Sequence, residues 1–420
     1  MYSNAYRGDV FPFVPVASEL SRRGHDVTFV CPREFHSVFA AEPFRVAHSG
    51  SDSLAPTNLD QHADWVAKWG MRLGGARQLK LFLGELCVPY LEDFYAALHA
   101  ELEGADLLVS HPAAALVGSM VAESLDVPWI DGDLFPMLLA TETRPPEPLP
   151  NLGKRANRLL WKSGRSRLFA PLTYQKDFAA FRRSKGLDAT ERSPIDAMRS
   201  PHLSLGLASP RYVVPAPDWP ESIRMTGFTM WEGPDGGALP DDVAQFLDAG
   251  DPPVLVTLGT SAASAAPERF EAAMDVLDEL GIRGIFLTST TEIADRLTAR
   301  DLSGRHGIWP FVSLSAVLPR CRAAVQSGSH GTNAMVLTAG LASVTSPVLF
   351  DQVWHGKRQE QLGTGVWAKK PARLAEALRR VLADADMQDA ASRLGEALRT
   401  EDGVATASDE IERFLISNSR

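Results

Sequence analysis

Short apolar runs that alternate with amphipathic segments constrain the fold of this sequence more than any other feature. Residues 26–31 form an apolar run that is typical of a buried strand, and apolar side chains recur at helical spacing just before it, at Phe13, Val16, Ala17 and Leu20. Further strand-like runs cover residues 105–110 and 127–131, with a helical pattern over 113–125 between them. Strands that alternate with helices indicate parallel pairing, so we expect a parallel sheet covered on both faces.

The same alternation restarts in the second half of the chain. Strand-like runs cover residues 253–259, 284–288, 323–326 and 342–346, and helical patterns include Phe270, Met274 and Leu277, then Leu374, Leu378, Val381 and Leu382, then Ile411, Phe414 and Leu415. A proline-rich segment, residues 212–220, separates the two halves. At roughly 150 residues per domain, a chain of 420 residues predicts two to three domains.

These patterns predict an α/β protein built from two doubly wound, Rossmann-like domains. We expect an N-terminal domain over residues 1–214, a C-terminal domain over 221–400 and a last helix within 401–420 that packs back on the first domain. Ligands of such sheets bind outside the carboxyl ends of the strands. The sequence therefore predicts two domains that face each other across a cleft.

The composition excludes several classes of protein. Hydrophobic residues make up 45% and charged residues 22%, as in an ordered globular chain. The net charge of −10 argues against a general nucleic-acid binder, which needs a basic face. Three widely separated cysteines, Cys31, Cys87 and Cys321, indicate neither a disulfide framework nor a zinc site. Without a transmembrane run of about 18 apolar residues or a signal-peptide core at its start, the chain is expected in the cytoplasm.

Residues 154–185 are basic in this otherwise acidic chain. They contain ten Lys or Arg residues and one acid, Asp177. Such a run is most often a solvated helical face. The alternative is a contact surface for an anionic acceptor or for a membrane interface, so peripheral membrane contact through this segment is a second expectation.

The segment QSGSHGTN, residues 326–333, carries the strongest chemical signal. It follows a strand-like run and leads into a helical pattern that stops at Gly340. Small residues let backbone amides approach an anion, and a helix N-terminus adds about half a positive charge. The segment therefore favours phosphate binding, although it is neither a Walker A nor a GxGxxG loop. An ordinary strand-to-helix turn is the alternative.

Two weaker signals lie at other predicted strand ends. Gly259 is followed by the hydroxyls of Thr260 and Ser261, which suit a phosphate. Asp351 stands beside Gln352, and a carboxylate next to an amide suits the adjacent hydroxyls of a sugar. The alternative for the second pair is a cap on the helix that follows.

In this order, the segments resemble the inverting glycosyltransferases with the GT-B fold, and most closely the bacterial natural-product and sterol glycosyltransferases. The resemblance covers nearly the whole chain. In the first half it rests on RGDVFPF (7–13) and LSRRGHDVT (20–28). In the second half it rests on MTGF (225–228), LPDDVAQFLDAG (239–250), PPVLVTLGT (252–260), VLPRC (317–321), the segment 326–333, Ala339-Gly340, Asp351-Gln352 and LGTG (362–365).

The resemblance implies transfer of a sugar from a UDP- or TDP-sugar to a hydroxyl of a lipophilic small molecule, such as a natural product, a sterol or a glycolipid. The anomeric centre would be inverted without a metal or another cofactor. Phe311 and the backbone of Val312 would bind the base, the segment 327–332 and Thr260 the diphosphate, and Asp351 and Gln352 the sugar. The full predicted substrate-binding set is Thr260, Phe311, Val312, Gln326, Ser327, Gly328, Ser329, His330, Gly331, Thr332, Asp351 and Gln352.

Asp9 is the predicted catalytic base, because the resemblance places a base there in relatives with the Arg-Gly-Asp-Val pattern. The reaction needs a group that takes the acceptor's proton as its oxygen attacks. A carboxylate is a weak base for a free hydroxyl, so it would act late, as that proton becomes acidic. The alternative is that Asp9 caps the helix predicted over residues 10–23, and the two roles are compatible.

The sequence departs from the resembled pattern in the diphosphate segment. Relatives usually carry two histidines where this chain has Gln326 and Ser327, and the second histidine normally bonds the diphosphate. Losing one hydrogen bond to a charged group costs about 1.5–3 kcal/mol, so donor binding is expected to be weaker or rebuilt. His330 either compensates or is a solvated residue at a helix start. Ser313 also replaces a usual proline after Val312.

The start of the chain departs as well, because relatives have an apolar strand before the equivalent of Tyr2-Ser3-Asn4. That strand is central in such a sheet, and its loss leaves ladder groups of its neighbours unpaired. We expect either that Met1 is not the natural start or that this form is unstable, and that an extended chain melts at a higher temperature.

Two other functions remain open at this point. A nucleotide-sugar 2-epimerase shares the fold, but it needs several carboxylates and a histidine around the sugar, and the first half offers no such cluster beyond Asp9. A non-catalytic nucleotide-sugar-binding or activator homologue would fit the Gln326 and Ser327 replacements. Contacts to the acceptor are expected from residues 54–77 and 138–161.

Overall fold

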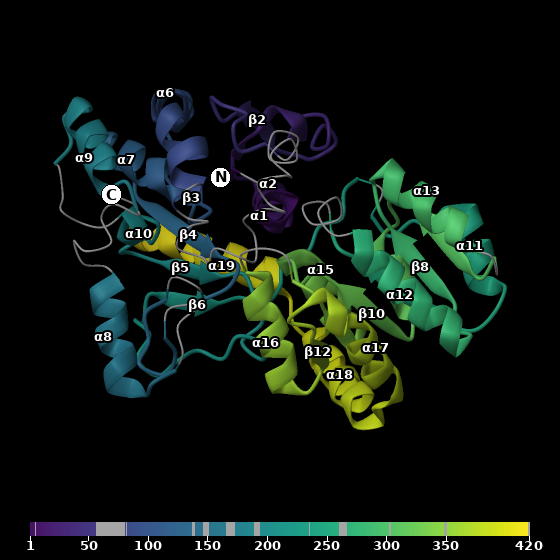
Figure 1. Cartoon of the computed structure of the whole chain (residues 1–420). Helices are drawn as coiled ribbons and strands as arrows, with labels where there is room; N and C mark the ends of the chain where they lie inside the picture. The colour runs from purple at the N-terminus through teal and green to yellow at the C-terminus, as the bar shows by residue number, and fades with distance from the viewer. Residues whose placement is uncertain are drawn as a thin grey trace. The chain divides into compact units, whose positions relative to one another are not determined.

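The computed structural model describes residues 1–4, 6–55, 80, 82–136, 139–145, 151–164, 173–188, 194–234, 236–259, 267–301, 304–347 and 351–418. The chain divides into two compact units (Figure 1). Unit 1 holds the described residues within 1–59, 72–229 and 402–420, and unit 2 those within 230–401. The chain passes from unit 1 to unit 2 after Thr229, beyond the proline-rich segment, and returns to unit 1 at Asp402.

Unit 1 is built on a parallel sheet. Its strands form two groups, one of two strands in the order β1-β2 and one of four strands in the order β3-β4-β5-β6. Every pair of neighbouring strands is parallel. The strands are β1 (Thr28–Cys31), β2 (Arg45–His48), β3 (Leu108–Ser110), β4 (Trp129–Asp133), β5 (Ser204–Gly206) and β6 (Ile223–Met225).

The first residues of the chain connect these two groups of strands. Tyr2 forms parallel bridges to Val30 on β1 and to Ser110 on β3. Its amide donates to the carbonyl of Val109 at 2.8 Å, and the amide of Val30 donates to the carbonyl of Met1 at 2.8 Å. Residues 1–3 therefore pair the ladder groups near the carboxyl ends of β1 and β3, which the sequence had led us to expect unpaired.

Helices cover both sides of this sheet, as the alternation of apolar and amphipathic segments predicts. Tyr2, Val30, Leu108 and Trp129 share one buried cluster with side chains of α6 and α7. The helices of unit 1 are α1 (Arg7–Val10), α2 (Val14–Arg22), α6 (Leu91–Leu102), α7 (Ala115–Ser124), α8 (Lys154–Gly164), α9 (Gln175–Ser184), α10 (Pro194–Ala197) and α19 (Gly403–Asn418), with shorter turns η1 (Phe11–Phe13), η2 (Arg33–Phe35), η3 (Phe82–Cys87) and η4 (Val88–Tyr90).

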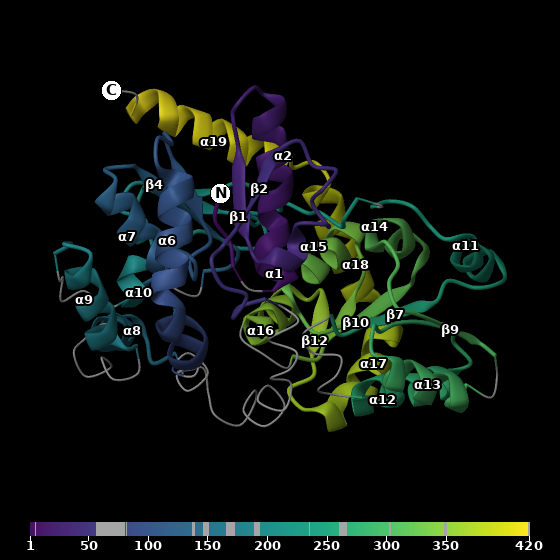
Figure 2. The same ribbon diagram turned by 90° about the horizontal axis from the view of Figure 1, so that it is seen from above.

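The last helix packs against the second helix of unit 1. Figure 2 shows α19, in yellow, beside α2, in purple. The guanidinium of Arg23 donates to Asp409 at 2.6 Å and to Glu412 at 2.7 Å, and His25 lies 3.0 Å from Glu412. These contacts join the two ends of the chain within one unit.

Basic residues of segment 154–185 pair with acids elsewhere in unit 1. Lys154 and Arg158 both contact Glu142. Nη2 of Arg182 donates to both carboxylate oxygens of Glu123, each at 2.8 Å. Lys185 contacts Glu92 at 2.5 Å. Membrane contact through this segment stays a prediction.

Unit 2 is built on one six-stranded parallel sheet in the order β12-β11-β10-β7-β8-β9. Its strands are β7 (Val254–Thr257), β8 (Gly284–Leu287), β9 (His306–Trp309), β10 (Ala323–Gln326), β11 (Ser343–Thr345) and β12 (Gly365–Trp367). The helices are α11 (Asp241–Asp248), α12 (Pro267–Leu280), α13 (Thr291–Arg300), α14 (Leu314–Val317), α15 (His330–Ala339), α16 (Gln352–Leu362), α17 (Leu374–Ala383) and α18 (Ala385–Leu398), with turns η6 (Leu318–Arg320) and η7 (Pro371–Arg373).

Successive side chains of these strands enter two separate buried clusters. Val254, Val256 and Val325 pack with residues of α12 and α17. Leu255 and Ala324 pack with residues of α11, α14 and α15. The sheet is therefore buried on both faces, which explains why its strands are continuous apolar runs.

The three cysteines, Cys31, Cys87 and Cys321, are buried free thiols. Among the described residues, no helix combines the length and the apolar character that crossing a membrane requires.

Candidate functional site

Asp9 is held at the start of the first helix of unit 1. It is the third residue of α1, and its Oδ2 accepts the backbone amide of Tyr6 at 3.1 Å. The hydroxyl of Ser3 donates to the carbonyl of Asp9 at 2.8 Å. The carboxylate therefore does cap its helix, and its side chain is still 31% exposed.

A histidine that sequence reasoning missed faces the second oxygen of Asp9. His111 follows β3 directly, and its Nε2 lies 3.6 Å from Oδ1 of Asp9, beyond hydrogen-bond range. Burial lowers the pKa of His111 to about 3, so its ring is neutral at physiological pH. The signal was its place at the carboxyl end of a predicted strand, the edge where ligands of such sheets bind.

In unit 2, residues 327–329 connect β10 to α15, and we call them the serine turn. Gly328 has φ +93°, and a Cβ there would lie 2.7 Å from Thr345 Cγ2 and 3.0 Å from the carbonyl oxygen of Gln352. Only glycine fits this position without strain. The tight fit also brings the serine turn against the start of α16.

The hydroxyls of the serine turn face the end of β7. A Cβ on Gly259 would lie 3.7 Å from Ser327 Oγ and 3.8 Å from Ser329 Oγ. Gln326 Oε1, Ser327 Oγ and Ser346 Oγ are buried without a hydrogen-bond partner among the described residues. Buried polar atoms are normally paired, so these atoms indicate a place for a polar ligand or water.

His330 begins α15 and is 2% exposed, so it is not a solvated residue. Its ring centroid lies 5.8 Å from that of His355 on α16. The possibility that His330 replaces the missing histidine of the diphosphate segment stays a prediction.

A chain of buried side-chain hydrogen bonds runs from β10 to α16, and we call it the amide relay. Gln326 Nε2 donates to Ser343 Oγ at 3.3 Å, and Ser343 Oγ donates to Gln359 Oε1 at 2.7 Å. Gln359 Nε2 donates to Asn333 Oδ1, and the amide of Asn333 lies 3.4 Å from Nδ1 of His355. All five side chains are buried.

The hydrogen bonds of the amide relay fix which end of each amide donates. Gln359 Oε1 accepts a second hydroxyl, from Thr345 at 3.2 Å, so its Nε2 is the end that donates to Asn333 Oδ1. Asn333 therefore turns its NH₂ toward His355, whose Nδ1 must accept. The proton of His355 then lies on Nε2, which points at Oδ2 of Asp351 at 3.6 Å.

The predicted base-binding residues follow β9. Phe311 is 58% exposed and Val312 is 1% exposed. The hydroxyl of Ser313 donates to Glu232 Oε2 at 3.0 Å and accepts the amide of Gly237 at 2.9 Å, so this segment is fixed without the usual proline. β9 lies three strands from β10, or about 14 Å at about 4.8 Å per strand.

The structure places the described candidates of unit 2 at one edge of its sheet. Phe311 follows β9, the serine turn follows β10, and Asp351 and Gln352 begin α16 after β11. Asp9 lies in unit 1. Thr260 lies outside the described residues, as do residues 56–77 and parts of 138–161 of the segments expected to contact the acceptor.

Among the described residues of unit 2, one group of side chains could hold a metal ion. Asp278, Asp301 and His306 bring their ligand atoms within 4.8 Å of one another. Arg305 contacts Asp278 at 3.6 Å, and Asp301 accepts the amides of Arg305 and His306. The group precedes β9, so it lies at the amino ends of the strands, opposite the candidate site.

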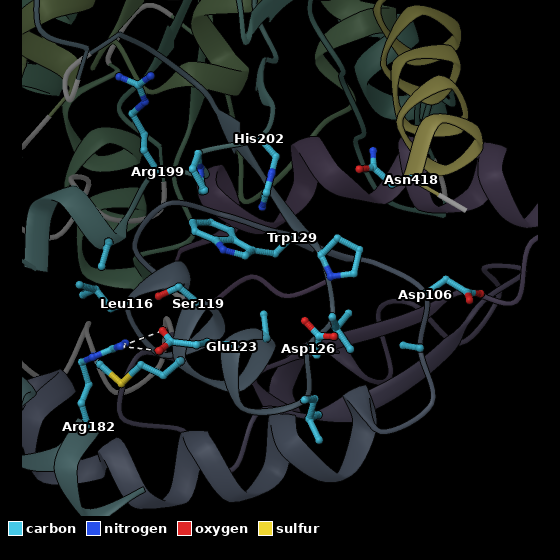
Figure 3. A pocket seen from close by; sticks show the side chains of 18 of the residues that line it. Asp106, Leu116, Ser119, Glu123, Asp126, Trp129, Arg182, Arg199, His202 and Asn418 are labelled. Atoms are coloured by element: carbon cyan, nitrogen blue, oxygen red, sulfur yellow. Dashed lines mark hydrogen bonds and ion pairs between the residues drawn. The ribbon is translucent and has the colours of Figure 1, made fainter. Parts of the chain in front are cut away.

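Unit 1 contains a cavity of about 1240 Å³ at the amino ends of β3, β4 and β5. Its wall includes Asp106 before β3, Trp129 at the start of β4 and His202 before β5 (Figure 3). Asp9 and His111 lie at the opposite, carboxyl ends of these strands. The cavity is therefore separate from the candidate catalytic residues.

No protein-family model matches the chain, but its relatives cover almost its full length. It is 28% identical to O-mycaminosyltylonolide 6-deoxyallosyltransferase of Streptomyces fradiae, across 97% of this chain and 95% of the relative. It is 28% identical to 4'-demethylrebeccamycin synthase of Lentzea aerocolonigenes, across 97% of each. It is 26% identical to sterol 3-beta-glucosyltransferase of Leptosphaeria maculans, across 97% of this chain and 28% of that longer protein.

Solved structures share the fold over the whole chain. The calicheamicin glycosyltransferase CalG4 matches with a TM-score of 0.70 at 20% identity, and covers 100% of this chain and 98% of its own. The glycosyltransferase VinC, in complex with dTDP, matches with a TM-score of 0.69 at 18% identity, with the same two coverages. These likenesses, with the two parallel-sheet units, confirm the predicted fold class.

Proposed function

We propose that this chain, which is a GT-B-fold glycosyltransferase by its homology and its fold, moves a sugar from a UDP- or TDP-sugar to a hydroxyl of a lipophilic small molecule with inversion of the anomeric centre. The prediction of a glycosyltransferase is confirmed by the relatives. The antibiotic and sterol enzymes among them support a natural product or a sterol as the acceptor. The complex of VinC with dTDP supports a pyrimidine diphosphate as the carrier.

The observation that carries the proposal is the carboxyl edge of the unit 2 sheet. The serine turn, the start of α15 and the buried oxygens of Gln326, Ser327 and Ser346 offer donors and acceptors with no partner among the described residues. Amides at a helix N-terminus favour an anion. We assign the diphosphate to this turn, the sugar to Asp351 and Gln352, and the base to Phe311 and Val312.

In the proposed reaction, the acceptor oxygen attacks the anomeric carbon and its proton passes to Asp9. The bond between the anomeric carbon and the distal phosphate oxygen breaks, and its electron pair stays on the nucleoside diphosphate. The partial exposure of the Asp9 side chain and its hydrogen bond to the Tyr6 amide suit this proton transfer. The reaction as proposed uses no metal ion.

Asp9→Asn tests the assignment of the base. It keeps the size of the side chain and an acceptor for the Tyr6 amide, so the fold is expected to remain intact. Transfer to the acceptor should fall about 10²–10⁴-fold, while the Kd for UDP or TDP stays unchanged. Asp177→Asn, on α9 of the same unit, is the control and should keep full activity. If Asp9→Asn transfers sugar at the parent rate, the assignment is wrong.

The donor is found by screening. At equal concentrations, UDP- and TDP-sugars should raise the melting temperature of the protein in the order of their affinities, since a ligand stabilises by RT ln(1 + [L]/Kd). The bound donor should also release its nucleoside diphosphate slowly without an acceptor. A protein that binds none of the panel would contradict the proposal.

A further inference from the structure

Arg269 is a buried cation that neither the sequence motifs nor the proposed reaction have used. It is the third residue of α12, the helix that follows β7, and it is 4% exposed. Arginine is almost never fully buried unless it is paired. The groups that contact the guanidinium of Arg269 therefore indicate its role.

Among the described residues, the guanidinium of Arg269 donates its hydrogen bond at the point where β10 leaves the sheet. β10 and β11 end their pairing at Gln326 and Thr345, and the amide of Ser346 donates to the carbonyl of Gln326 at 2.8 Å. In a continuing parallel ladder, the next bond would run from the amide of Gly328 to the carbonyl of Ser346. Instead, Nη1 of Arg269 donates to that carbonyl at 2.8 Å.

The guanidinium thus takes the place of the next strand amide, beside the serine turn. Gly328 turns away from the ladder there with φ +93°. The other end of the turn is the start of α15, whose first amides are free of intrahelical bonds. A cation, a turn of small residues and a helix N-terminus therefore meet at one end of the sheet.

Among the described residues, the counter-charge that acts on Arg269 is the carboxylate of its neighbour Glu268, which does not form an ion pair with it. No described carboxylate forms an ion pair with it, Nε has no hydrogen-bond partner there, and the neighbouring Glu268 is exposed. The flanking segments 260–266 and 348–350 contain no Asp or Glu in the sequence. Burying a guanidinium that has no ion-pair partner costs several kcal/mol, so the site favours an anion.

Two buried hydroxyls that follow the carboxyl ends of β10 and β11 suit an anion with several oxygens. Ser327 Oγ and Ser346 Oγ are both buried and have no partner among the described residues. A hydroxyl can donate one hydrogen bond, and a guanidinium can donate several in a fixed plane. Together they can bind two or more oxygens of one diphosphate.

We propose that Arg269 binds the diphosphate of the donor and neutralises the charge that this group gains when the glycosidic bond breaks. The inference rests on the proposed function, because it takes the nucleoside diphosphate as the leaving group. When the anomeric carbon–oxygen bond breaks, the electron pair remains on the diphosphate, and Arg269 stabilises that added negative charge. Arg269 does this without itself exchanging a proton.

The test compares a nucleoside with its diphosphate. Calorimetry gives the Kd of uridine, thymidine, UDP and TDP for the parent, Arg269→Gln and Arg269→Lys. For whichever of UDP and TDP binds the parent more tightly, Arg269→Gln should raise the Kd about 10- to 100-fold. The Kd of the corresponding nucleoside should stay unchanged. Arg269→Lys keeps the charge but not the planar fork, so it should lose affinity for the diphosphate about 3- to 10-fold.

Arg283→Gln is the matched control. Arg283 also donates to backbone carbonyls, those of Asp251 and Phe246, but it precedes β8 at the opposite edge of the same sheet. The Arg283→Gln variant should leave the ratio of the Kd for the nucleoside to the Kd for its diphosphate unchanged.

The outcomes separate the two proposals. A parent that binds neither nucleotide would contradict the proposed function itself. A parent that binds a diphosphate, with Arg269→Gln folded and binding it equally well, would leave Arg269 as a structural bond to Ser346 and overturn the inference. If Arg269→Gln does not fold, an unchanged Kd for Arg269→Lys overturns it instead.

Discussion

In unit 2, the imidazole Nε2 of His355 lies 3.6 Å from Oδ2 of Asp351, one helical turn earlier on the chain. The amide relay places the proton of His355 on this nitrogen, so an N–H dipole points at the carboxylate that we assign to the donor sugar. The other end of the relay is Gln326, beside the serine turn. The residues that we propose for the sugar and those that we propose for the diphosphate thus share one buried network.

His355→Phe should weaken the binding of the donor more than the chemical step. Phenylalanine fills the buried space but removes the N–H dipole that faces Asp351 at 3.6 Å, beyond hydrogen-bond range, and an electrostatic contact of this kind contributes about 1 kcal/mol at most. We expect the donor KM to rise about 5-fold with kcat changed less than 2-fold. Steady-state kinetics with varied donor measure both.

A double-mutant cycle shows whether His355 acts through Asp351. In an Asp351→Asn background, the added His355→Phe change should cost little, because the carboxylate that it positions is already gone. Additive effects of the two changes on KM would show that His355 acts elsewhere, for example on the packing of α16.

His111 should leave the pH dependence of catalysis unchanged. Burial lowers its pKa to about 3, so the ring stays neutral throughout an assay between about pH 5.5 and 9. His111→Phe keeps the aromatic edge toward Phe13 and should lower kcat less than about 10-fold. The shape of the profile of kcat/KM against pH should match that of the parent. If the variant's profile of kcat/KM against pH gained or lost a rising or falling part near pH 7, His111 would share a titrating proton with Asp9.

The sequence predicted the strands that are long apolar runs. The predicted run 323–326 is β10, and the runs 253–259 and 284–288 contain β7 and β8. These strands lie inside a sheet that is buried on both faces. Every side chain of such a strand packs in the core, so the strand appears in the sequence as a continuous apolar run. The position of the diphosphate segment between a strand and a helix was visible for the same reason.

The runs 26–31, 105–110, 127–131 and 342–346 likewise contain or overlap β1, β3, β4 and β11, whereas β2, β5, β6, β9 and β12 were not predicted. β12 has two apolar side chains, those of Val366 and Trp367, and all three residues of β6 are partly or fully exposed. Each is three residues long and lies at the edge of its sheet, so half of its neighbours are missing. His111, Arg269 and the amide relay were missed because their meaning depends on which distant side chains they face, and a linear pattern does not contain that information.

Asp131 should make unit 1 less stable as the pH rises. It is a buried residue of β4, and burial raises its pKa to about 6, while burial and the neighbouring Asp131 carboxylate raise the pKa of Asp133 well above its usual value. A carboxyl with a raised pKa in the folded state stabilises fully below about pH 4 and loses that contribution as the pH rises through about 6. The loss for Asp131 is about 2–3 kcal/mol.

Asp131→Asn should therefore stabilise the protein at pH 8 and flatten its dependence on pH. Oδ1 accepts the amide of Ser200 at 2.6 Å and the hydroxyl of Ser204 at 2.8 Å, and asparagine keeps that oxygen. Urea unfolding at pH 5 and pH 8, followed by a probe of unit 1, measures the difference. The exposed Asp106→Asn is the control and should follow the parent. A variant that is less stable than the parent at pH 8 would show that the charged form of Asp131 stabilises, through Arg199.

Gly328→Ala should disrupt the serine turn and with it the binding of the donor. The backbone at φ +93° costs an L-residue about 1–2 kcal/mol, and the added Cβ would lie 2.7 Å from Thr345 Cγ2. We expect the melting temperature to fall by several degrees and the affinity for UDP or TDP to fall at least 10-fold. Gly331→Ala, where a Cβ meets nothing within 4 Å on α15, should keep or raise the melting temperature, because alanine is the better helix former. Equal melting temperatures for the two variants would mean that the turn relaxes without strain, and the tight contact between the serine turn and α16 would not constrain the site.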